Sequence, residues 1–289
     1  MQQNKSPLVS VIIPTYNSAR TLETTLKSVK DQTYPNIEMI VVDNQSKDET
    51  KQIAEKYADA VYIKWPERTA QKNYGIKKAK GDYIVFIDSD MELSSNVITE
   101  CVEVYENTRE CGGVCIPERS VWDGWLSKVR DFERSFYKGS GVESARFFKK
   151  SDVERVWWFE EDLIFFEESL LPQKITQRLD KDCQVSINAT INHHESRVSL
   201  YDWLKKKFYY GKSLSIYQKK VQELWIAKIA KDQMSLLQRY MIFFKSSRFW
   251  SHPLLALGVL FLKTCEFWAG GLGVIFSMIS KIVIKHKKI

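Results

Sequence analysis

The chain has 289 residues, of which 44% are hydrophobic and 27% charged, with a formal net charge of +7. This length and composition exclude a disordered chain and allow one large hydrophobic core or two smaller ones. The positive excess lies mainly after residue 200, next to apolar segments and without a nucleic-acid motif, so we expect an anionic membrane surface as its partner rather than nucleic acid.

The first half of the chain alternates between predicted strands and helices. Strands are predicted at residues 8–13, 37–42, 60–65 and 83–87, and helices at 18–29, 49–57 and 68–79. The strand segments are short apolar runs rich in β-branched residues, which is typical of strands buried on both faces. Their alternation with helices predicts a parallel sheet with helical crossovers. Asn17 or Ser18 is expected to cap the first helix.

Polar residues follow these strands at their C-terminal ends, the edge where open α/β sheets bind ligands. Asp88 and Asp90 follow the fourth strand, Asp43 follows the second, and residues 14–16 follow the first. Two carboxylates so close together repel unless a cation shares them, and their oxygens suit Mg²⁺ or Mn²⁺. With basic residues at 68–72, this edge predicts a nucleoside-diphosphate site. Taken alone, Asp43 could equally be a turn or capping residue.

The second half is predicted to continue the same sheet. Helices are expected at 96–105 and 122–137, and strands at 112–117, 144–148 and 184–191. The amphipathic helix 122–137 is expected either to cover an acceptor site or simply to pack on the core. Arg146 is expected either to lie near phosphate or to face solvent.

Three blocks of the sequence resemble family 2 glycosyltransferases of the GT-A fold. They are VSVIIPTYN at residues 9–17, IVVDNQSKD at 40–48 and GDYIVFIDSD at 81–90. The resemblance covers residues 8 to about 195 and weakens after 115. It implies an α/β fold with a Rossmann-like, mostly parallel sheet and flanking helices, and an inverting, metal-dependent transfer from a nucleoside-diphosphate sugar. We expect a nucleotide-sugar half at residues 1–115, an acceptor half at 116–198 and a helical tail at 199–289.

The resemblance also implies roles for single residues. It assigns the nucleotide to Pro14, Thr15, Tyr16, Asp43, Arg68, Lys72, Asp88 and Ser89, with Asp43 at the base and Arg68 or Lys72 at the diphosphate. It assigns the metal to Asp88 and Asp90. In His193-His194-Glu195 it favours His193 over His194 as a third metal ligand. Neutral imidazole suits Mn²⁺ better than Mg²⁺, so Mn²⁺ gains slightly.

The acidic pair Glu167-Glu168 follows an aromatic stretch and falls where the family carries its general base. The resemblance implies Glu168 as the base. Glu-Glu in place of Glu-Asp and the different residues at 169–172 leave Glu167 as the alternative. Both could instead simply stabilise a helix N-terminus. Burial among aromatic residues is expected to raise the pKa of the base towards a useful value.

The tail is expected to contact a membrane. Residues 201–217 mix aromatic residues and lysines, as interfacial helices do. Residues 253–284 are apolar but contain Lys263, Glu266 and a glycine cluster at 270–273, so neither half reaches the roughly 18 residues of a spanning helix. We therefore expect a re-entrant or in-plane helical hairpin. One tilted span, or a soluble surface for a helical partner, are the alternatives.

The remaining features indicate the compartment. Five cysteines, an odd number without zinc-site spacing, predict buried thiols in a reducing compartment. The polar first ten residues lead directly into a strand, without the apolar region of a signal peptide. We expect the catalytic part in the cytosol, at the cytoplasmic face of the cell membrane.

The sequence as a whole predicts a membrane-associated inverting glycosyltransferase. Its acceptor is expected to be a hydroxyl of a lipid-linked, polyprenyl-type saccharide in cell-surface glycan assembly. The alternatives are a polyprenyl-phosphate monoglycosyl synthase, whose ionised phosphate nucleophile needs no base, and a non-catalytic nucleotide-binding scaffold.

Overall fold

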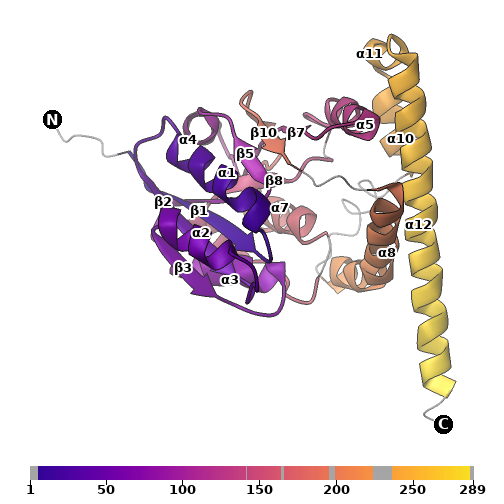
Figure 1. Cartoon of the computed structure of the whole chain (residues 1–289), viewed down its shortest axis with the longest axis horizontal. Coiled ribbons are helices and arrows are strands. Elements are labelled where there is room, and N and C mark those ends of the chain that lie inside the picture. The colour runs from indigo at the N-terminus through magenta and orange to yellow at the C-terminus, as the bar shows by residue number, and fades with distance from the viewer. Residues whose placement is uncertain (1–5, 141, 164–165, 195–198, 224–235, 287–289) are drawn as a thin grey trace.

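The structure is a computed structural model that describes residues 6–140, 142–163, 166–194, 199–223 and 236–286 (Figure 1). Gly141 and Glu195 lie outside the described residues. Figure 1 shows an α/β domain on one side and the long helix α12 running along the other, with α5 and α8 between them. The tail is therefore packed against the domain rather than separated from it.

A mostly parallel sheet forms the centre of the domain. Among the described residues it has seven strands in the order β3-β2-β1-β4-β8-β6-β9. The strands are β1 (Val9–Thr15), β2 (Ile37–Asp43), β3 (Ala60–Ile63), β4 (Tyr83–Phe86), β6 (Val114–Cys115), β8 (Ala145–Lys149) and β9 (Val185–Ser186). The first four are parallel, and β8 runs antiparallel to β4 and β6. The predicted parallel sheet with crossovers is confirmed.

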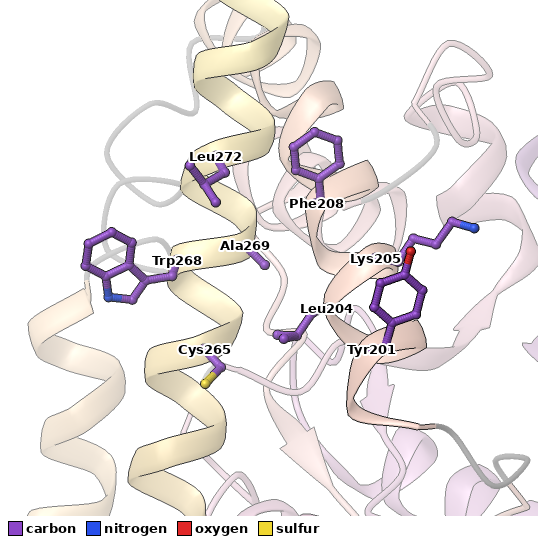
Figure 2. Close-up of a pocket in the computed structure, with 8 residues that line it drawn as sticks. All are labelled: Tyr201, Leu204, Lys205, Phe208, Cys265, Trp268, Ala269 and Leu272. Carbon is purple, nitrogen blue, oxygen red and sulfur yellow. The ribbon is translucent and has the colours of Figure 1, made fainter.

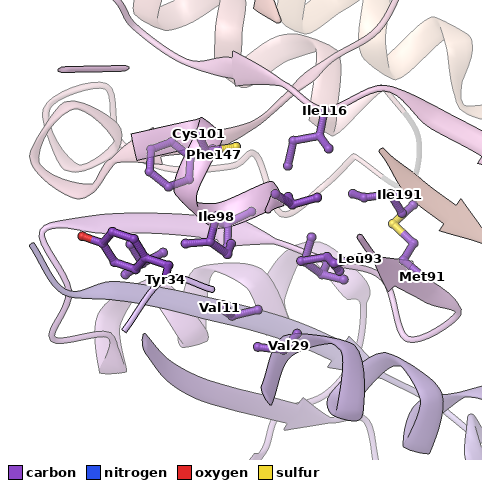
Figure 3. Close-up of a cluster of buried hydrophobic side chains, with 14 of the residues drawn as sticks. Val11, Val29, Tyr34, Met91, Leu93, Ile98, Cys101, Ile116, Phe147 and Ile191 are labelled. Atoms are coloured by element: carbon purple, nitrogen blue, oxygen red, sulfur yellow. The ribbon is translucent and has the colours of Figure 1, made fainter. Parts of the chain in front are cut away.

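Helices cover both faces of this sheet because successive strand residues point to opposite sides. Val11 of β1 belongs to a core cluster with residues of α1 (Ala19–Lys30), α2 (Thr50–Tyr57) and α4 (Val97–Asn107). Figure 3 shows this cluster, in which Val11 and Val29 lie below Ile98 and Phe147. Ile12 belongs to the other cluster, with residues of α3 (Arg68–Lys78), α6 (Lys150–Arg155) and α7 (Glu167–Leu179).

A second, small sheet crosses the C-terminal edge of the first. It has the order β5 (Met91–Leu93), β10 (Ile191–His193), β7 (Glu118–Ser120). The prediction of one strand at 184–191 is wrong, because β9 pairs with β6 whereas β10 pairs with β5 and β7. Ile187 and Ile191 are both buried, so the apolar alternation continues while the hydrogen-bonding partners change.

Smaller predictions need adjustment. The helix at 122–137 is shorter, α5 (Trp125–Arg134), and its Val129 and Phe132 pack against the tail. Ser18 precedes α1 but makes no side-chain capping hydrogen bond; its hydroxyl instead lies 2.8 Å from that of Ser89. All five cysteines are free thiols; four are buried and Cys265 is partly exposed.

The tail is helical. It consists of α8 (Leu200–Glu223), α10 (Leu236–Phe244), α11 (Ser247–Trp250) and α12 (Pro253–His286). The predicted hairpin is wrong, because α12 is one continuous helix of 34 residues. Its glycines permit close packing instead of a turn: a Cβ at Gly211 of α8 would overlap the backbone of Gly270, and one at Gly273 would overlap the carbonyl of Phe208.

Lys263 and Glu266 of α12 are buried against the domain. Lys263 Nζ lies 2.5 Å from Glu133 Oε1 of α5 and 2.6 Å from Glu266 Oε2. Glu266 also accepts a hydrogen bond of 2.8 Å from the indole of Trp203 in α8. The ion pairs therefore attach α12 to α5 and α8. By length and composition, residues 253–280 of α12 could cross a membrane, a property that buried core helices also show.

Candidate functional site

The loops after β1 and β2 form one end of the site. Thr15 and Asp43 are register partners at the ends of these strands. Asp43 is buried, and its carboxylate accepts hydrogen bonds from the Thr15 hydroxyl at 3.0 Å and from the Ser46 backbone N–H at 2.8 Å. The Gln71 side-chain amide donates to the Thr15 carbonyl at 2.9 Å. These contacts hold the buried carboxylate of Asp43 in place. The ring of Tyr16, the residue after Thr15, is exposed to solvent.

Pro14 is buried within β1, so it shapes the strand end rather than facing the opening. The loops after β1 and β4 are joined through Ser18 and Ser89, whose hydroxyls lie 2.8 Å apart. Ser89 separates Asp88 from Asp90. The fourth strand is therefore followed by two aspartates that lie next to the loops after β1 and β2.

The two aspartates face different partners. Asp88 lies 3.8 Å from Arg68 and 3.6 Å from Arg146, measured between carboxylate oxygens and Nη1 atoms. Asp90 Oδ1 lies 3.2 Å from His193 Nε2. The imidazole of His194 lies 2.7 Å from the carboxylate of Glu92, although the His194 backbone N–H donates to the Asp90 carbonyl at 2.7 Å. The structure thus brings the imidazole of His193, and not that of His194, to the aspartate pair.

This arrangement partly fits a divalent cation. No set of three histidine, cysteine, aspartate or glutamate side chains is gathered for a metal within the described part of the chain. Asp90 and His193 nevertheless offer a carboxylate and an imidazole at one partly exposed point, and cations such as Mn²⁺ accept remaining ligands from water or phosphate. Burial lowers the pKa of His193, but hydrogen bonds to Asp90 and Glu118 outweigh this and raise it to about 9. A ligating imidazole must be neutral, so metal binding here would displace a proton.

The acidic pair begins α7 and faces basic residues of α3. Glu167 Oε1 accepts from Arg68 Nη2 at 2.6 Å, and Glu168 Oε1 accepts from Lys72 Nζ at 2.6 Å. Lys72 is fully buried, whereas the Arg68 side chain is 41% exposed. Of the two candidates for the diphosphate, Arg68 is therefore the accessible one.

The expected rise in the pKa of Glu168 is wrong. Burial does act to raise this pKa, but the positive charges of Lys72, Arg146 and Arg68 outweigh it and hold the pKa far below the ordinary value. Arg146 Nη1 lies 3.7 Å from Glu168 Oε1. The carboxylate is therefore ionised at neutral pH, and its basicity is low as long as these cations surround it.

Glu118 is part of the site although the sequence did not indicate it. It accepts from Arg146 Nη2 at 2.7 Å and lies 3.1 Å from Arg134 and 3.4 Å from His193. Burial raises its pKa, but Arg146 and Arg134 outweigh burial and lower it well below the ordinary value. Glu118 directly follows the predicted strand at 112–117, as Asp43 follows the predicted strand at 37–42. This position was the signal in the sequence that could have indicated Glu118. Arg146 is itself buried, so the solvent-facing alternative for it is wrong.

The sequence comparison agrees with this geometry. Residues 10–142 match the model of Glycosyl transferase family 2. The match covers a little under half of the chain. The matched part includes β1 to β4, and hence Thr15, Asp43, Asp88 and Asp90.

Curated relatives share part of their length with the chain. GalNAc(5)-diNAcBac-PP-undecaprenol beta-1,3-glucosyltransferase of Campylobacter jejuni is 27% identical over 73% of this chain and 65% of the relative. An uncharacterized glycosyltransferase of Rickettsia typhi is 45% identical over 36% of this chain and 34% of the relative. The chain thus spans less than two thirds of the length of either relative.

A solved structure shows the same fold. The mannosyltransferase PcManGT from Pyrobaculum calidifontis, in complex with GDP-Man and Mn²⁺, superposes with a TM-score of 0.65 at 17% identity, covering 94% of this chain and 88% of that one. At this identity the likeness concerns the fold alone, and the GT-A-type architecture is confirmed.

Proposed function

We propose that this chain transfers a sugar from a nucleoside-diphosphate donor to an acceptor hydroxyl with inversion at the anomeric carbon. The observation that carries the proposal is the convergence of carboxylates from the loop after β4, from β7 and from α7 on the cations Arg68, Lys72 and Arg146. Such a cluster can bind a charged donor, stabilise a leaving diphosphate and hold a base.

The donor would lie along the sheet edge from the first strands towards α7. The nucleoside would occupy the loops after β1 and β2, with its base near Asp43 and Thr15 and beside Tyr16. Its diphosphate would meet Arg68, whose guanidinium is half exposed, while Asp88 would approach the ribose. Lys72 would not contact the diphosphate directly, because its buried ammonium pairs with Glu168. It would contribute positive charge beneath the acidic pair.

Asp90, Asp88 and His193 would hold Mn²⁺ or Mg²⁺. The chemistry that such an ion supplies when bound is neutralisation of the negative charge that develops on the leaving diphosphate. Glu118 would keep His193 and Arg146 in place through its contacts with both. A ligand set of two carboxylates and one imidazole would favour Mn²⁺ slightly over Mg²⁺.

Glu168 would remove the proton from the acceptor hydroxyl, with Glu167 as the alternative. Its low pKa has a direct consequence for this role. Glu168 becomes a better base only when some of the positive charge around it is taken up by another anion, and the donor diphosphate at Arg68 and Arg146 is the natural candidate. The proposal therefore includes binding of the donor before proton removal.

The acceptor would be a lipid-linked, polyprenyl-type saccharide in cell-surface glycan assembly, at the cytoplasmic face of the membrane. The apolar tail helix supports a membrane location, and the Campylobacter relative is named for a PP-undecaprenol substrate. A polyprenyl-phosphate monoglycosyl synthase is the second candidate, since the same tail would serve it.

A thermal-shift panel of nucleoside diphosphates with and without Mn²⁺ tests donor binding, because a ligand of the native state raises its melting temperature. Radiolabelled transfer from the donor so identified then tests catalysis. Glu168→Gln should lower turnover about a hundredfold or more if a hydroxyl is the nucleophile. Nearly unchanged turnover would favour the phosphate acceptor, and binding without any transfer would leave a nucleotide-binding scaffold.

A further inference from the structure

One face of α12 is largely apolar and exposed, with an interruption at Thr264, whose hydroxyl lies 3.0 Å from that of Tyr240 in α10. The residues that form this stripe recur every three or four positions, which places them on one side of a helix. They are Leu254, Leu257, Phe261, Trp268, Leu272, Ile275 and Ile279, each more than half exposed. Leu254 and Ile279 are separated by about 38 Å of helix. Leu237 of α10 and Trp250 of α11, both more than 60% exposed, extend the same apolar surface.

The opposite face of α12 packs on protein in its first half and in its middle. Its first half packs on α5, where Gly258 contacts Val129 and Trp125 and where Lys263 pairs with Glu133. Its middle packs on α8 through the close approach of Gly273 to Phe208. Figure 1 shows the whole domain on one side of α12 and none of it on the other.

This packing is incompatible with a helix that crosses a bilayer. If α12 crossed the roughly 30 Å hydrocarbon layer, α8, which is packed on it, would enter the hydrocarbon as well. The exposed lysines Lys205 and Lys206 of α8 would then lie in lipid, which is costly. The part of α12 beyond its contact with α8 is short: from Phe276, which lies under Lys212, to His286 the helix rises only about 15 Å. That length is half of what a crossing requires.

The surroundings of the stripe suit an anionic lipid surface. Glu266 is the only acidic residue of α10, α11 and α12, and it is buried, whereas Lys245 and Arg248 are exposed beside α11. Between α8 and α12 lies an apolar cavity of about 470 Å³, lined by Leu204, Phe208, Ala269 and Leu272 among others, with Lys205 and Tyr201 at its rim (Figure 2). An apolar hollow with a basic rim matches an acyl chain below an acidic headgroup.

We propose that α12 lies in the plane of an anionic phospholipid bilayer, with this stripe buried at the boundary between headgroups and acyl chains, and does not span it. The inference rests on the membrane association in the proposed function and specifies its geometry. It also sets the direction of the active edge. Tyr217 of α8 packs in one buried cluster with Leu170 of α7, the helix that begins with the acidic pair. The active edge thus faces the helix layer that rests on the membrane, where a lipid-linked acceptor would be found.

The depth of three positions along the stripe tests this geometry. In a Cys265→Ser background, nitroxide labels are attached to single cysteines at Leu257, Trp268 and Ile279, and their depth in vesicles of phosphatidylglycerol and phosphatidylcholine is measured by collisional relaxation. An in-plane helix places all three labels at about 5–10 Å below the headgroups. A depth that changes steadily, over about 33 Å from position 257 to 279, would overturn the proposal in favour of a span.

Vesicle partitioning of the full chain provides the second measurement. Leu257→Ser combined with Ile279→Ser should weaken partitioning into the anionic vesicles about tenfold or more, because two apolar side chains no longer leave water. Ile63→Ser, at a similarly exposed apolar residue of β3, is the matched control and should partition as the wild type does. Equal partitioning of all three proteins would overturn the proposal.

Two further outcomes are distinguishable. If the labels are shielded from both lipid and water and the chain sediments as a dimer, the stripe is an interface between two copies, and the proposal fails. Neither measurement uses glycosyl transfer. An in-plane α12 in a protein that transfers no sugar would therefore refute the proposed function alone, and active protein with a spanning α12 would refute this inference alone.

Discussion

Replacing Lys72 by methionine removes a cation from beneath the acidic pair while keeping a side chain of similar length. The Lys72 ammonium is completely buried, 2.6 Å from Glu168 and 3.6 Å from Glu167, and it lies 5.3 Å from the centre of the Phe159 ring. An apolar thioether fits these aromatic surroundings. The variant therefore tests the charge of Lys72 with little change in packing.

The expected cost can be worked out from the contacts that remain. Removal of one partner from a buried ion pair costs about 3–5 kcal/mol. Glu167 keeps Arg68 at 2.6 Å and Glu168 keeps Arg146 at 3.7 Å, so we expect the lower limit, about 3 kcal/mol at pH 7.5.

The cost should also depend on pH. In the wild type the folded-state pKa of Glu168 lies below its ordinary value of 4.5, so this carboxylate contributes stability that is present above that pH and is lost as the pH falls below it. In Lys72→Met the pKa of Glu168 rises, because the strongest of the attractive charges is gone. The difference in unfolding free energy between the two proteins should therefore shrink as the pH falls towards 4.5 and below.

Urea unfolding at several pH values measures this difference, and the pH profile of sugar transfer measures the acid limb, which should move upward in the variant. Lys174→Met is the matched control: Lys174 is equally buried and pairs with Glu160 at 3.0 Å. It should cost similar stability and leave the acid limb unchanged. A cost below about 1 kcal/mol for Lys72→Met, together with an unmoved acid limb, would show that Lys72 does not control Glu168.

Two further predictions concern the supports of the site and of the tail. Glu118→Gln removes the carboxylate that lies 3.4 Å from His193 Nδ1 and would position this proposed metal ligand, so it should weaken Mn²⁺ binding about tenfold in a thermal-shift titration; unchanged affinity would contradict a positioning role. Gly211→Ala would overlap the backbone of Gly270 and should cost about 1–3 kcal/mol, whereas Gly271→Ala, which has open space around its Cβ, should not; equal melting temperatures would contradict the close helix contact.

The fold and the carboxylates of the sheet edge could be predicted because both depend on short-range patterns. Successive residues of β1 are buried on opposite faces of the sheet, as Val11 and Ile12 are. A strand buried on both faces can be recognised from a short run of apolar residues in the sequence. Asp43 and Asp88 follow such runs directly. The ends of parallel strands lie at one edge, so the pattern of strands alone placed both aspartates at that edge of the sheet.

The charge balance of the site could not be predicted in the same way. Arg68 and Glu167 are 99 positions apart in sequence, and no local pattern indicates that they form an ion pair. Aromatic neighbours of Glu168 were visible in the sequence and predicted a raised pKa. Its buried cations, Lys72 and Arg146, come from other elements and reverse the direction of the shift.

The tail shows the same limit of local information. Gly270 and Gly273 indicated a turn because glycine weakens an isolated helix. In the folded chain they face α8, where the missing side chains allow two backbones to touch. Lys263 and Glu266 indicated a cost in lipid, but Glu133 and Trp203 supply their partners inside the protein.

The ion pairs between α3 and α7 have a consequence for selectivity. Because Glu167 and Glu168 already occupy Arg68 and Lys72, the empty edge offers little net attraction to a passing anion. A free nucleotide or inorganic phosphate must displace a carboxylate before it gains a cation, and it lacks the sugar that would fill the space beyond. On the proposed function, the acidic pair would therefore compete with free phosphates for Arg68 and Lys72 and would favour a ligand that arrives with its own counter-ion.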